Sequence, residues 1–412
     1  MPRVLWLRTW PERRASVTGR QPAPSATNYP LMCLLPPQRS FQRIRRLFPT
    51  PVMAQSPSGL GTSCSRAADV GYAIVDIVLR KGPIAMNVHF PDAGTIRTVL
   101  ALASRAPSVH NTQPWRWLVG RESLHLYSDA DRQLPNTDPD GRDLILSCAA
   151  ALNHCVVAFA AVGWRAKVAR LPNPADPSHL AAIELSRSTA DPVDIALAAA
   201  IPRRRTDRRH YSSWPVPVGD IALMAARAAR NGVTLCQVED TDKLHKIVAQ
   251  SVWDHMTHDY LAELTAWSGR YASVAGVPAR NTPKSDPKAK IPGRLFAGPA
   301  LAMPSGSSAA EDNAVVLALG TRADDRLAQL RAGEATSIVL LTATSMGLAS
   351  CPVTEPLEMA ETREAVRSEI FGSSSFPQML LRVGWAPINA DPLPSTPRRE
   401  LSDFVEWMAD SE

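Results

Sequence analysis

The sequence of 412 residues lacks several short motifs that identify common classes of enzyme. It has no Gly-x-Gly-x-x-Gly after a predicted strand, no Walker phosphate loop, no His-Glu-x-x-His and no Gly-x-Ser-x-Gly. The first of these motifs opens the dinucleotide-binding turn of a Rossmann domain. A Rossmann nicotinamide site is therefore not indicated.

Cysteine is scarce and irregularly spaced. The six cysteines, at positions 33, 64, 148, 155, 236 and 351, form no Cys-x-x-Cys pair. Cys148 and Cys155 lie seven residues apart in an apolar segment, which is typical of buried thiols rather than of a zinc site or a disulfide framework. This usage predicts no metal site and favours a reducing, cytoplasmic compartment.

The excess of basic residues is confined to the beginning of the chain. The net charge is +6, but residues 1–85 carry 12 Lys and Arg against 3 Asp and Glu, a balance of +9. The other residues carry 33 basic and 36 acidic side chains, a balance of −3. That part of the chain gives no general reason to expect a nucleic-acid partner.

One strongly apolar run, Leu144–Val162, is long enough to raise the question of a membrane anchor. Polar Asn153 and His154 lie at its centre, and charged Arg142 and Asp143 come just before it. These residues favour a buried core helix over a spanning one, with no contact to a membrane. His154 is then expected to be a core histidine with its hydrogen bonds satisfied.

Residues 1–85 differ from the rest of the chain. They are rich in Arg, Pro and Ser and have no sustained periodicity before Val70–Leu79. Three interpretations remain open: a targeting segment, a disordered tail, or translated sequence upstream of the true start. Met86, which directly precedes the first good helix, is favoured as the functional start.

From Asp92 onward, hydrophobic periodicity predicts alternating helices and strands. Helices are expected from 92 to a stop at Pro107, and over 141–162, 191–200, 220–229, 241–267 (as one or two), 332–348 and 401–408; strands are expected at 115–119, 124–127, 166–169 and 379–383. Residues 268–313 are rich in Pro, Gly, Ala and Ser and lack periodicity. Such a long connection is expected to be an active-site lid or a disordered insertion.

Two segments carry the side chains that suit a flat, phosphorylated ligand. In the first, residues 105–117 read Arg-Ala-Pro-Ser-Val-His-Asn-Thr-Gln-Pro-Trp-Arg-Trp, a turn made rigid by two prolines and rich in hydrogen-bonding groups. In the second, residues 201–211 read Ile-Pro-Arg-Arg-Arg-Thr-Asp-Arg-Arg-His-Tyr. Its arginines suit a phosphate, although a solvated basic loop or a nucleic-acid patch would show the same pattern.

Both segments resemble motifs of the FMN-dependent nitroreductase family. Arg204, Thr206 and Arg208 match the Arg-x-Ser-x-Arg motif that grips the FMN phosphate in that family. The Pro-Ser-x-x-Asn-x-Gln-Pro-Trp motif, which reaches the flavin, is matched by Pro107, Ser108, Asn111, Gln113, Pro114 and Trp115. Two weaker matches follow: residues 346–355, which place Thr354 and Glu355 along the flavin ring, and Arg398 with Arg399, which complete the phosphate pocket.

The two motifs occur here in reversed order, and each half of the chain lacks the motif that the other supplies. The resemblance, strongest to the mycobacterial Acg-like, dormancy-associated members, therefore implies an α+β fold in which two nitroreductase-like halves are fused. Residues 86–195 would form the first half and residues 196–412 the second, with 268–313 as a lid-like insertion. The chain would be a monomeric pseudo-dimer with one complete flavin site.

The resemblance also implies a function. NAD(P)H would pass a hydride to the FMN N5 atom, and the flavin would reduce a nitro, quinone or other electron-poor small molecule. No side chain needs to act as a catalytic nucleophile. The alternative is a flavin-binding or flavin-storing protein whose closed lid prevents turnover. His110 would either cover the flavin or cap its turn, and of Trp115 and Trp117 at least one is expected in the core.

Overall fold

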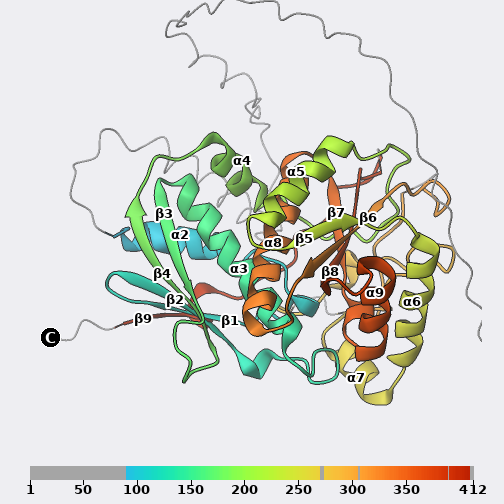
Figure 1. Ribbon diagram of the computed structural model, residues 1–412, viewed down its shortest axis with the longest axis horizontal. Coiled ribbons are helices and arrows are strands. Elements are labelled where there is room, and N and C mark those ends of the chain that lie inside the picture. The colour runs from blue at the N-terminus through green and yellow to red at the C-terminus, as the bar shows by residue number, and fades with distance from the viewer. Residues whose placement is uncertain (1–89, 270–272, 305–306, 388, 409–412) are drawn as a thin grey trace, which may run out of the picture. The chain divides into compact units, whose positions relative to one another are not determined.

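The computed structural model describes residues 90–412, except 270–272, 305–306, 388 and 409–412 (Figure 1). All of them belong to one compact unit. The predicted N-terminal extension and the predicted start at Met86 lie outside the described residues.

The first sheet has five strands in the order β3-β4-β2-β1-β9. Its strands are β1 (Trp115–Val119), β2 (Ser123–Ser128), β3 (Trp164–Arg170), β4 (His179–Arg187) and β9 (Val405–Trp407). Helices α2 (Ala93–Ala103), α3 (Arg142–Ala161) and α4 (Pro192–Ala200) share one apolar core with this sheet. Trp115 and Trp117 are both buried in that core, as expected for at least one of them. Asp92 caps α2, because its side chain accepts a hydrogen bond from the Thr95 backbone N–H at 2.8 Å.

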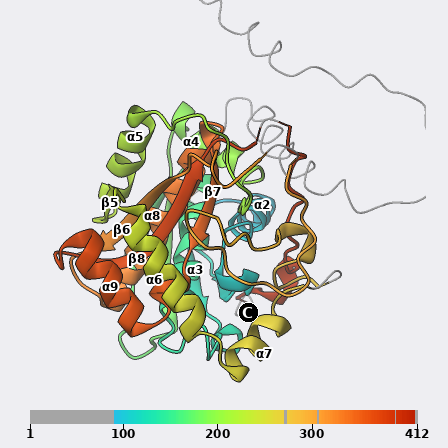
Figure 2. The same ribbon diagram turned by 90° about the vertical axis from the view of Figure 1, so that its right-hand side faces the viewer.

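The second sheet has four antiparallel strands in the order β5-β6-β8-β7 and is buried between two layers of helices. Its elements are β5 (Thr234–Gln237), β6 (Val315–Thr321), β7 (Ala349–Val353), β8 (Phe376–Gly384), α5 (Val218–Ala229), α6 (Thr241–Asp254), α7 (His258–Ala266), α8 (Arg326–Ser345) and α9 (Ala360–Phe371). Successive β6 side chains point to opposite faces. Leu317 and Leu319 pack with α5 and α8, whereas Val316 and Ala318 pack with α6 and α9 (Figure 2).

Helices α3 and α8 pack against each other between the two sheets (Figure 1). Their approach is close at Gly333, where a Cβ atom would overlap the carbonyl oxygen of Leu146 and the side chain of Ala149. Helix α3 is the one described helix long and apolar enough to cross a membrane, and 83% of its most apolar window is buried within the protein. The prediction of a buried core helix is confirmed.

Most predicted elements are present with small shifts. Residues 241–267 form two helices, and α8 begins six residues before the predicted 332. The predicted helix at 401–408 is wrong. Residues Leu401–Asp403 form one 3₁₀ turn (η6), and β9 then pairs in parallel with β1, where Trp117 aligns with Val405. Three further 3₁₀ turns are η3 (Ala130–Arg132), η4 (Ala279–Asn281) and η5 (Glu355–Leu357).

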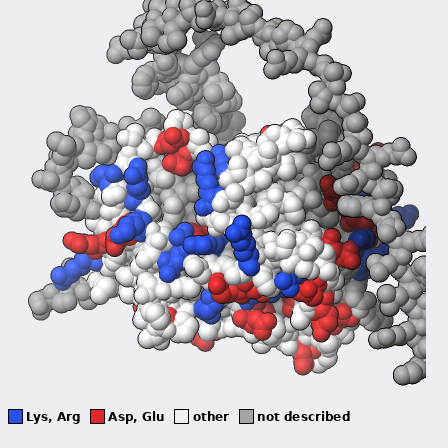
Figure 3. Space-filling view, viewed as in Figure 1, with Lys and Arg blue, Asp and Glu red and all other residues white. Residues whose placement is uncertain are grey.

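The predicted α+β class is confirmed. In the two described sheets every pair of strands is antiparallel except β1 with β9. The predicted boundary between halves, at 195/196, falls inside α4, and β9 brings the end of the chain back to the first sheet. On the face shown in Figure 3, acidic and basic side chains both occur, in several separate groups.

Candidate functional site

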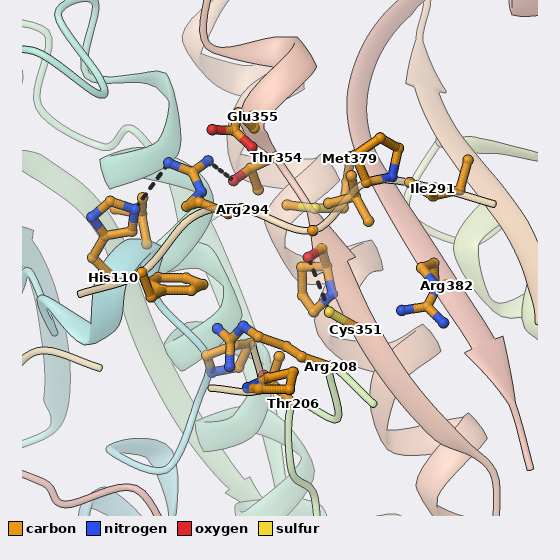
Figure 4. Close-up of a pocket in the computed structure, with 18 of the residues that line it drawn as sticks. His110, Thr206, Arg208, Ile291, Arg294, Cys351, Thr354, Glu355, Met379 and Arg382 are labelled. Carbon is orange, nitrogen blue, oxygen red and sulfur yellow. Dashed lines mark hydrogen bonds between the residues drawn. The ribbon is translucent and has the colours of Figure 1, made fainter. Parts of the chain in front are cut away.

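A pocket lies beside the α3–α8 pair, where segments distant in the sequence converge (Figure 4). Its walls come from residues 107–110, one face of α3, residues 206–210, parts of 283–303, and residues 351–355. The cavity has a volume of about 170 Å³, whereas a buried water needs only about 10–15 Å³. The space therefore suits a ligand considerably larger than water.

Pro107 and Ser108 line the pocket from a strained turn that contains the 3₁₀ turn η2 (Val109–Asn111). His110, Asn111 and Gln113 have φ values of +43°, +56° and +54°, in the left-handed region that side chains other than glycine rarely adopt. The Ser108 Oγ atom accepts a hydrogen bond from the Gln113 backbone N–H at 3.0 Å, which closes the turn. The hydroxyl hydrogen of Ser108 stays available to an acceptor in the pocket.

The amide side chains of Asn111 and Gln113 are used by the protein itself, and neither lines the pocket. Asn111 Nδ2 donates to the carbonyl oxygens of Gly276 at 3.0 Å and Pro397 at 3.3 Å. Gln113 Nε2 donates to the Val274 carbonyl oxygen at 2.9 Å. These hydrogen bonds connect the turn to residues 268–313, hereafter the long loop, and to the C-terminal segment around Pro397. A direct contact of either amide with a cofactor remains a prediction.

Thr206 and Arg208 of the basic segment line the same pocket as Ser108. Thr206 lies beside Ser350, with which it forms an isolated parallel bridge. The Arg208 guanidinium lies over the Phe296 ring at 4.8 Å, and its Nη1 donates to the Asn281 carbonyl oxygen at 3.3 Å. Within the described part of the chain no carboxylate pairs with Arg208, and burial lowers the pKa of its guanidinium. Arg208 is therefore a cation open to a ligand.

Arg204 and Arg398 do not line this pocket but belong to a separate cluster of guanidiniums, formed with Arg105 and Arg205. Burial, followed by the charges of Arg205 and Arg105, lowers the pKa of Arg204 to about 9. Burial and the neighbouring arginines also lower the pKa of Arg398. Among the described residues no carboxylate counts among the charges that act on Arg204 or Arg398, so the cluster carries uncompensated positive charge.

Backbone carbonyl groups hold the cluster in place without neutralising it. Arg398 Nε donates to the Ser104 carbonyl oxygen at 2.6 Å, and Nη2 donates to those of Arg105 and Ala106, both at 3.1 Å. The Nε and Nη1 atoms of Arg204 are buried and have no hydrogen-bond partner. The Nε atom of Arg105 is also buried and without a partner. Buried donors without an acceptor are costly, so these atoms mark a place for an anion.

Arg399, the second of the predicted C-terminal pair, lies apart from this cluster. Its backbone N–H donates to Gln113 Oε1 at 2.9 Å, and its Nη1 donates to the Gln113 carbonyl oxygen at 3.2 Å. Nη2 donates to the Asp403 carbonyl oxygen, and Asp129 lies 3.8 Å from Nη1. Arg399 therefore stabilises the turn that contains Ser108 and Gln113.

The long loop inserts Arg294 into the pocket, where it reaches toward His110 and Thr354 (Figure 4). Its Nη1 donates to Tyr260 Oη at 2.7 Å, and its Nη2 donates to Thr354 Oγ1 at 3.1 Å and to Glu358. Thr354 Oγ1 in turn donates to Glu358 Oε1 at 2.8 Å. Thr354 therefore lines the pocket, but its hydroxyl group already forms hydrogen bonds with Arg294 and Glu358.

His110 faces the same guanidinium, since Arg294 Nη1 donates to its Nε2 at 3.0 Å. Burial, then the charges of Arg294 and Arg208, lowers the pKa of His110 well below 6.5. The ring is therefore neutral, with its hydrogen on Nδ1, and Nδ1 is buried without a partner. His110 borders the pocket as a hydrogen-bond donor.

Sequence reasoning missed Arg294, Phe296 and Asp143 as pocket residues. The first two lie in a loop without periodicity, so no local pattern distinguishes them from their neighbours. Asp143 is one of a series on α3 with Leu146, Ser147 and Ala150, which all line the pocket. Their spacing of three and four residues, which places them on one face of the helix, can be recognised in the sequence. The sequence does not show that this face borders a pocket. Three residues of helix α3, Cys148, Cys155 and His154, were also predicted from the sequence to be buried. Cys148 and Cys155 are buried free thiols, as expected. His154 is buried in the core as expected, and its Nδ1 lies 2.8 Å from Ser337 Oγ. The expectation that all its hydrogen bonds are satisfied is wrong, because Nε2 is buried without a partner.

Comparison with known proteins gives consistent matches. A sequence model described as the nitroreductase family matches residues 201–385. The protein named "Putative NAD(P)H nitroreductase Rv3131" from Mycobacterium tuberculosis (strain ATCC 25618 / H37Rv) is 70% identical over 328 residues, which is 79% of this chain and 95% of the relative. "Putative NAD(P)H nitroreductase acg" from the same strain is 35% identical over 325 residues, or 76% of this chain and 96% of the relative.

The solved structures that this chain matches include two that are described as nitroreductases. The FMN-dependent nitroreductase NfnB from Mycobacterium smegmatis, in complex with NADPH, has a TM-score of 0.34 and 15% identity, over 53% of this chain and 100% of that chain. A nitroreductase with bound FMN from Bacteroides fragilis NCTC 9343 has a TM-score of 0.31 and 15% identity, over 47% of this chain and 90% of that chain.

Proposed function

The chain belongs to the nitroreductase family, and from this premise we propose that it binds FMN and transfers electrons from NAD(P)H to a small, electron-poor acceptor such as a nitro compound or a quinone. The observation that carries this proposal is the meeting of two distant segments. Ser108 and Arg208, a hundred residues apart in the sequence, line one pocket. One chain thereby supplies both of the family's flavin-contacting motifs.

The arginine cluster suits the FMN phosphate, which carries close to two negative charges. Arg204 has two buried nitrogen atoms without a partner, and Arg105 has one. A phosphate group accepts hydrogen bonds at several oxygen atoms at once and would satisfy these donors. Arg204 and Arg398 would hold the phosphate, and Thr206, two residues after Arg204, lines the pocket.

The pocket suits the polar edge of a flavin ring. The Ser108 hydroxyl, the Nδ1 hydrogen of His110 and the Arg208 guanidinium are donors around it that the protein does not neutralise. When bound, the flavin supplies the redox chemistry by accepting a hydride and passing it on. The residues of this chain hold the ring, keep donors directed at it and limit the access of water. We place this chemistry in the reducing cytoplasm, consistent with the free thiols of Cys148 and Cys155.

A second function is favoured by one observation, the anchoring of the long loop over the pocket. Residues 283–303 contribute much of the wall, and Arg294 fastens them to Tyr260, Thr354 and Glu358. A loop fixed in this way would hinder a nicotinamide from stacking on a bound flavin. The protein would then bind or store FMN without turnover.

Anaerobic addition of NADPH to purified protein separates these functions. We expect the protein to be yellow and its visible flavin absorbance to be lost within seconds to minutes of mixing. A yellow protein that keeps its absorbance would instead support storage, and a colourless protein that does not take up added FMN would refute both.

The contribution of the loop is tested by the double variant Arg294→Met/Glu358→Gln, which removes both members of the buried ion pair that anchors the loop. Arg280→Met, an exposed position on the same loop, is the control. If the anchor restricts access, the double variant should bleach faster with NADPH than the wild type and the control. Equal rates in all three proteins would show that the anchored loop does not limit access.

A further inference from the structure

The wall that helix α3 contributes to the pocket includes one acidic residue. Asp143, Leu146, Ser147 and Ala150 line it, at a spacing that places them on one face of the helix. Asp143 is only 3% exposed and lies in the first turn. The other three are apolar or hydroxyl groups, so Asp143 is the titratable group of this wall.

Both carboxylate oxygens of Asp143 are buried without a hydrogen bond. The backbone N–H groups at the start of α3 do not donate to these oxygens. The N–H groups of Asp143 and Leu144 donate instead to the Asp138 carboxylate, at 2.9 Å and 2.7 Å. The nearest cation is Arg142, whose Nη2 lies 2.6 Å from Asp143 Oδ1 in an ion pair without hydrogen-bond geometry. A buried carboxyl group with so few donors favours its protonated form.

The surroundings of Asp143 contain as many acidic as basic groups. The charged groups that act on it are Arg142 of α3, Asp138 of the preceding turn, Glu358 after η5 and Arg294 of the long loop. Burial raises the pKa of Asp143 to about 7, since the carboxylates of Asp138 and Glu358 offset the two guanidiniums. Burial also raises the pKa of Asp138. A pKa of about 7 allows Asp143 to carry a proton at neutral pH, in the wall of the pocket.

We propose that Asp143 is the proton donor for reduction of the acceptor, a role that rests on the proposed function. Reduction of a quinone to a hydroquinone consumes one hydride and one proton. The reduced flavin is oxidised as it gives up the hydride, and the acceptor is reduced. The Asp143 O–H bond breaks as a bond from that hydrogen to an acceptor oxygen forms. Asp143 is left as a carboxylate and regains its proton from water.

The test compares Asp143→Asn with Asp140→Asn, an exposed carboxylate three residues earlier, in the turn that precedes α3. Holoprotein is photoreduced, which avoids any dependence on NADPH, and is then mixed in a stopped-flow instrument with benzoquinone or with ferricyanide. Benzoquinone needs a proton and ferricyanide does not. We expect Asp143→Asn to slow reoxidation by benzoquinone about 100-fold, in the usual range for loss of a general acid. Reoxidation by ferricyanide should not change, and Asp140→Asn should match the wild type with both oxidants.

A second readout does not depend on activity. Infrared difference spectra of the protein between pH 5 and 9 should show a carboxylic-acid carbonyl band that titrates near neutral pH. The band should be missing in Asp143→Asn and present in Asp140→Asn. The proposal is overturned if this band is absent from the wild type. It is also overturned if the Asp143→Asn protein binds flavin but its reoxidation is slowed equally with both oxidants or with neither. Protein that cannot hold flavin would instead refute the proposed function, and the infrared result would still show whether Asp143 carries a proton.

Discussion

Replacing Arg204 by methionine tests whether the arginine cluster is built for an anion. Arg204 is 6% exposed, and burial, together with Arg205 and Arg105, lowers the pKa of its guanidinium from 12.5 to about 9. One pH unit of difference in a pKa corresponds to about 1.4 kcal/mol. Holding Arg204 charged therefore costs the ligand-free fold on the order of 5 kcal/mol. Methionine has a similar length and no charge, so it should relieve most of this cost.

We expect Arg204→Met to raise the free energy of unfolding of FMN-free protein by about 2–5 kcal/mol at pH 7. The pKa in the fold lies below that in the unfolded chain, so the cost is complete below pH 9 and is relieved as pH rises from 9 toward 12.5. The gain from the substitution should therefore be equal at pH 6 and pH 8. The same variant should lose its stabilisation by FMN, which for the wild type is about 2.7 kcal/mol at 100 times the Kd.

The assay is urea denaturation with and without added FMN. Arg203→Met is the matched control, because Arg203 precedes Arg204 in the chain but is exposed. It should behave like the wild type in both conditions. The reasoning is refuted if FMN-free Arg204→Met is less stable than the wild type, or if FMN stabilises it as strongly.

Other variants test the flavin site, the helix contact and the pH dependence. Arg204→Ala with Arg208→Ala should purify without flavin, measured by visible absorbance; full retention would refute the assignment of these two arginines to the flavin site. Gly333→Ala should cost about 1–3 kcal/mol or more in urea denaturation, because a Cβ overlaps α3, whereas Gly219→Ala, with open space around it, should cost far less. Burial raises the folded pKa of Asp143 from 3.8 to about 7, so the wild type loses stability as pH rises from 4 to 7. Asp143→Asn should not show this loss, and identical pH profiles would contradict the shifted pKa.

The parts of the fold that were predictable have strong local signals. Helix α3 and strand β8 are continuous apolar runs, and Asp92 followed by spaced apolar residues marks the start of α2. The parts that were missed depend on distant partners. Strand β9 has three residues and exists because β1 offers it an edge. Helix α9 is largely polar, so its apolar face is hard to recognise from the sequence.

The site was predictable to a similar degree. The residue types around Ser108 and Arg208 indicated a shared ligand, and the pocket places both residues in its wall. The orientations of Asn111 and Gln113 were not predictable, because their partners Gly276 and Val274 lie more than 160 residues away. Arg294 gave no local signal, since its importance arises from four side chains on other segments.

Sedimentation velocity, followed at the visible absorbance of the flavin, tests the central claim most directly. If one polypeptide completes the pocket, the flavin should sediment with a single chain, at one FMN per chain. Flavin that sediments only with a two-chain species, or protein of native size that carries none after incubation with FMN, would contradict the account.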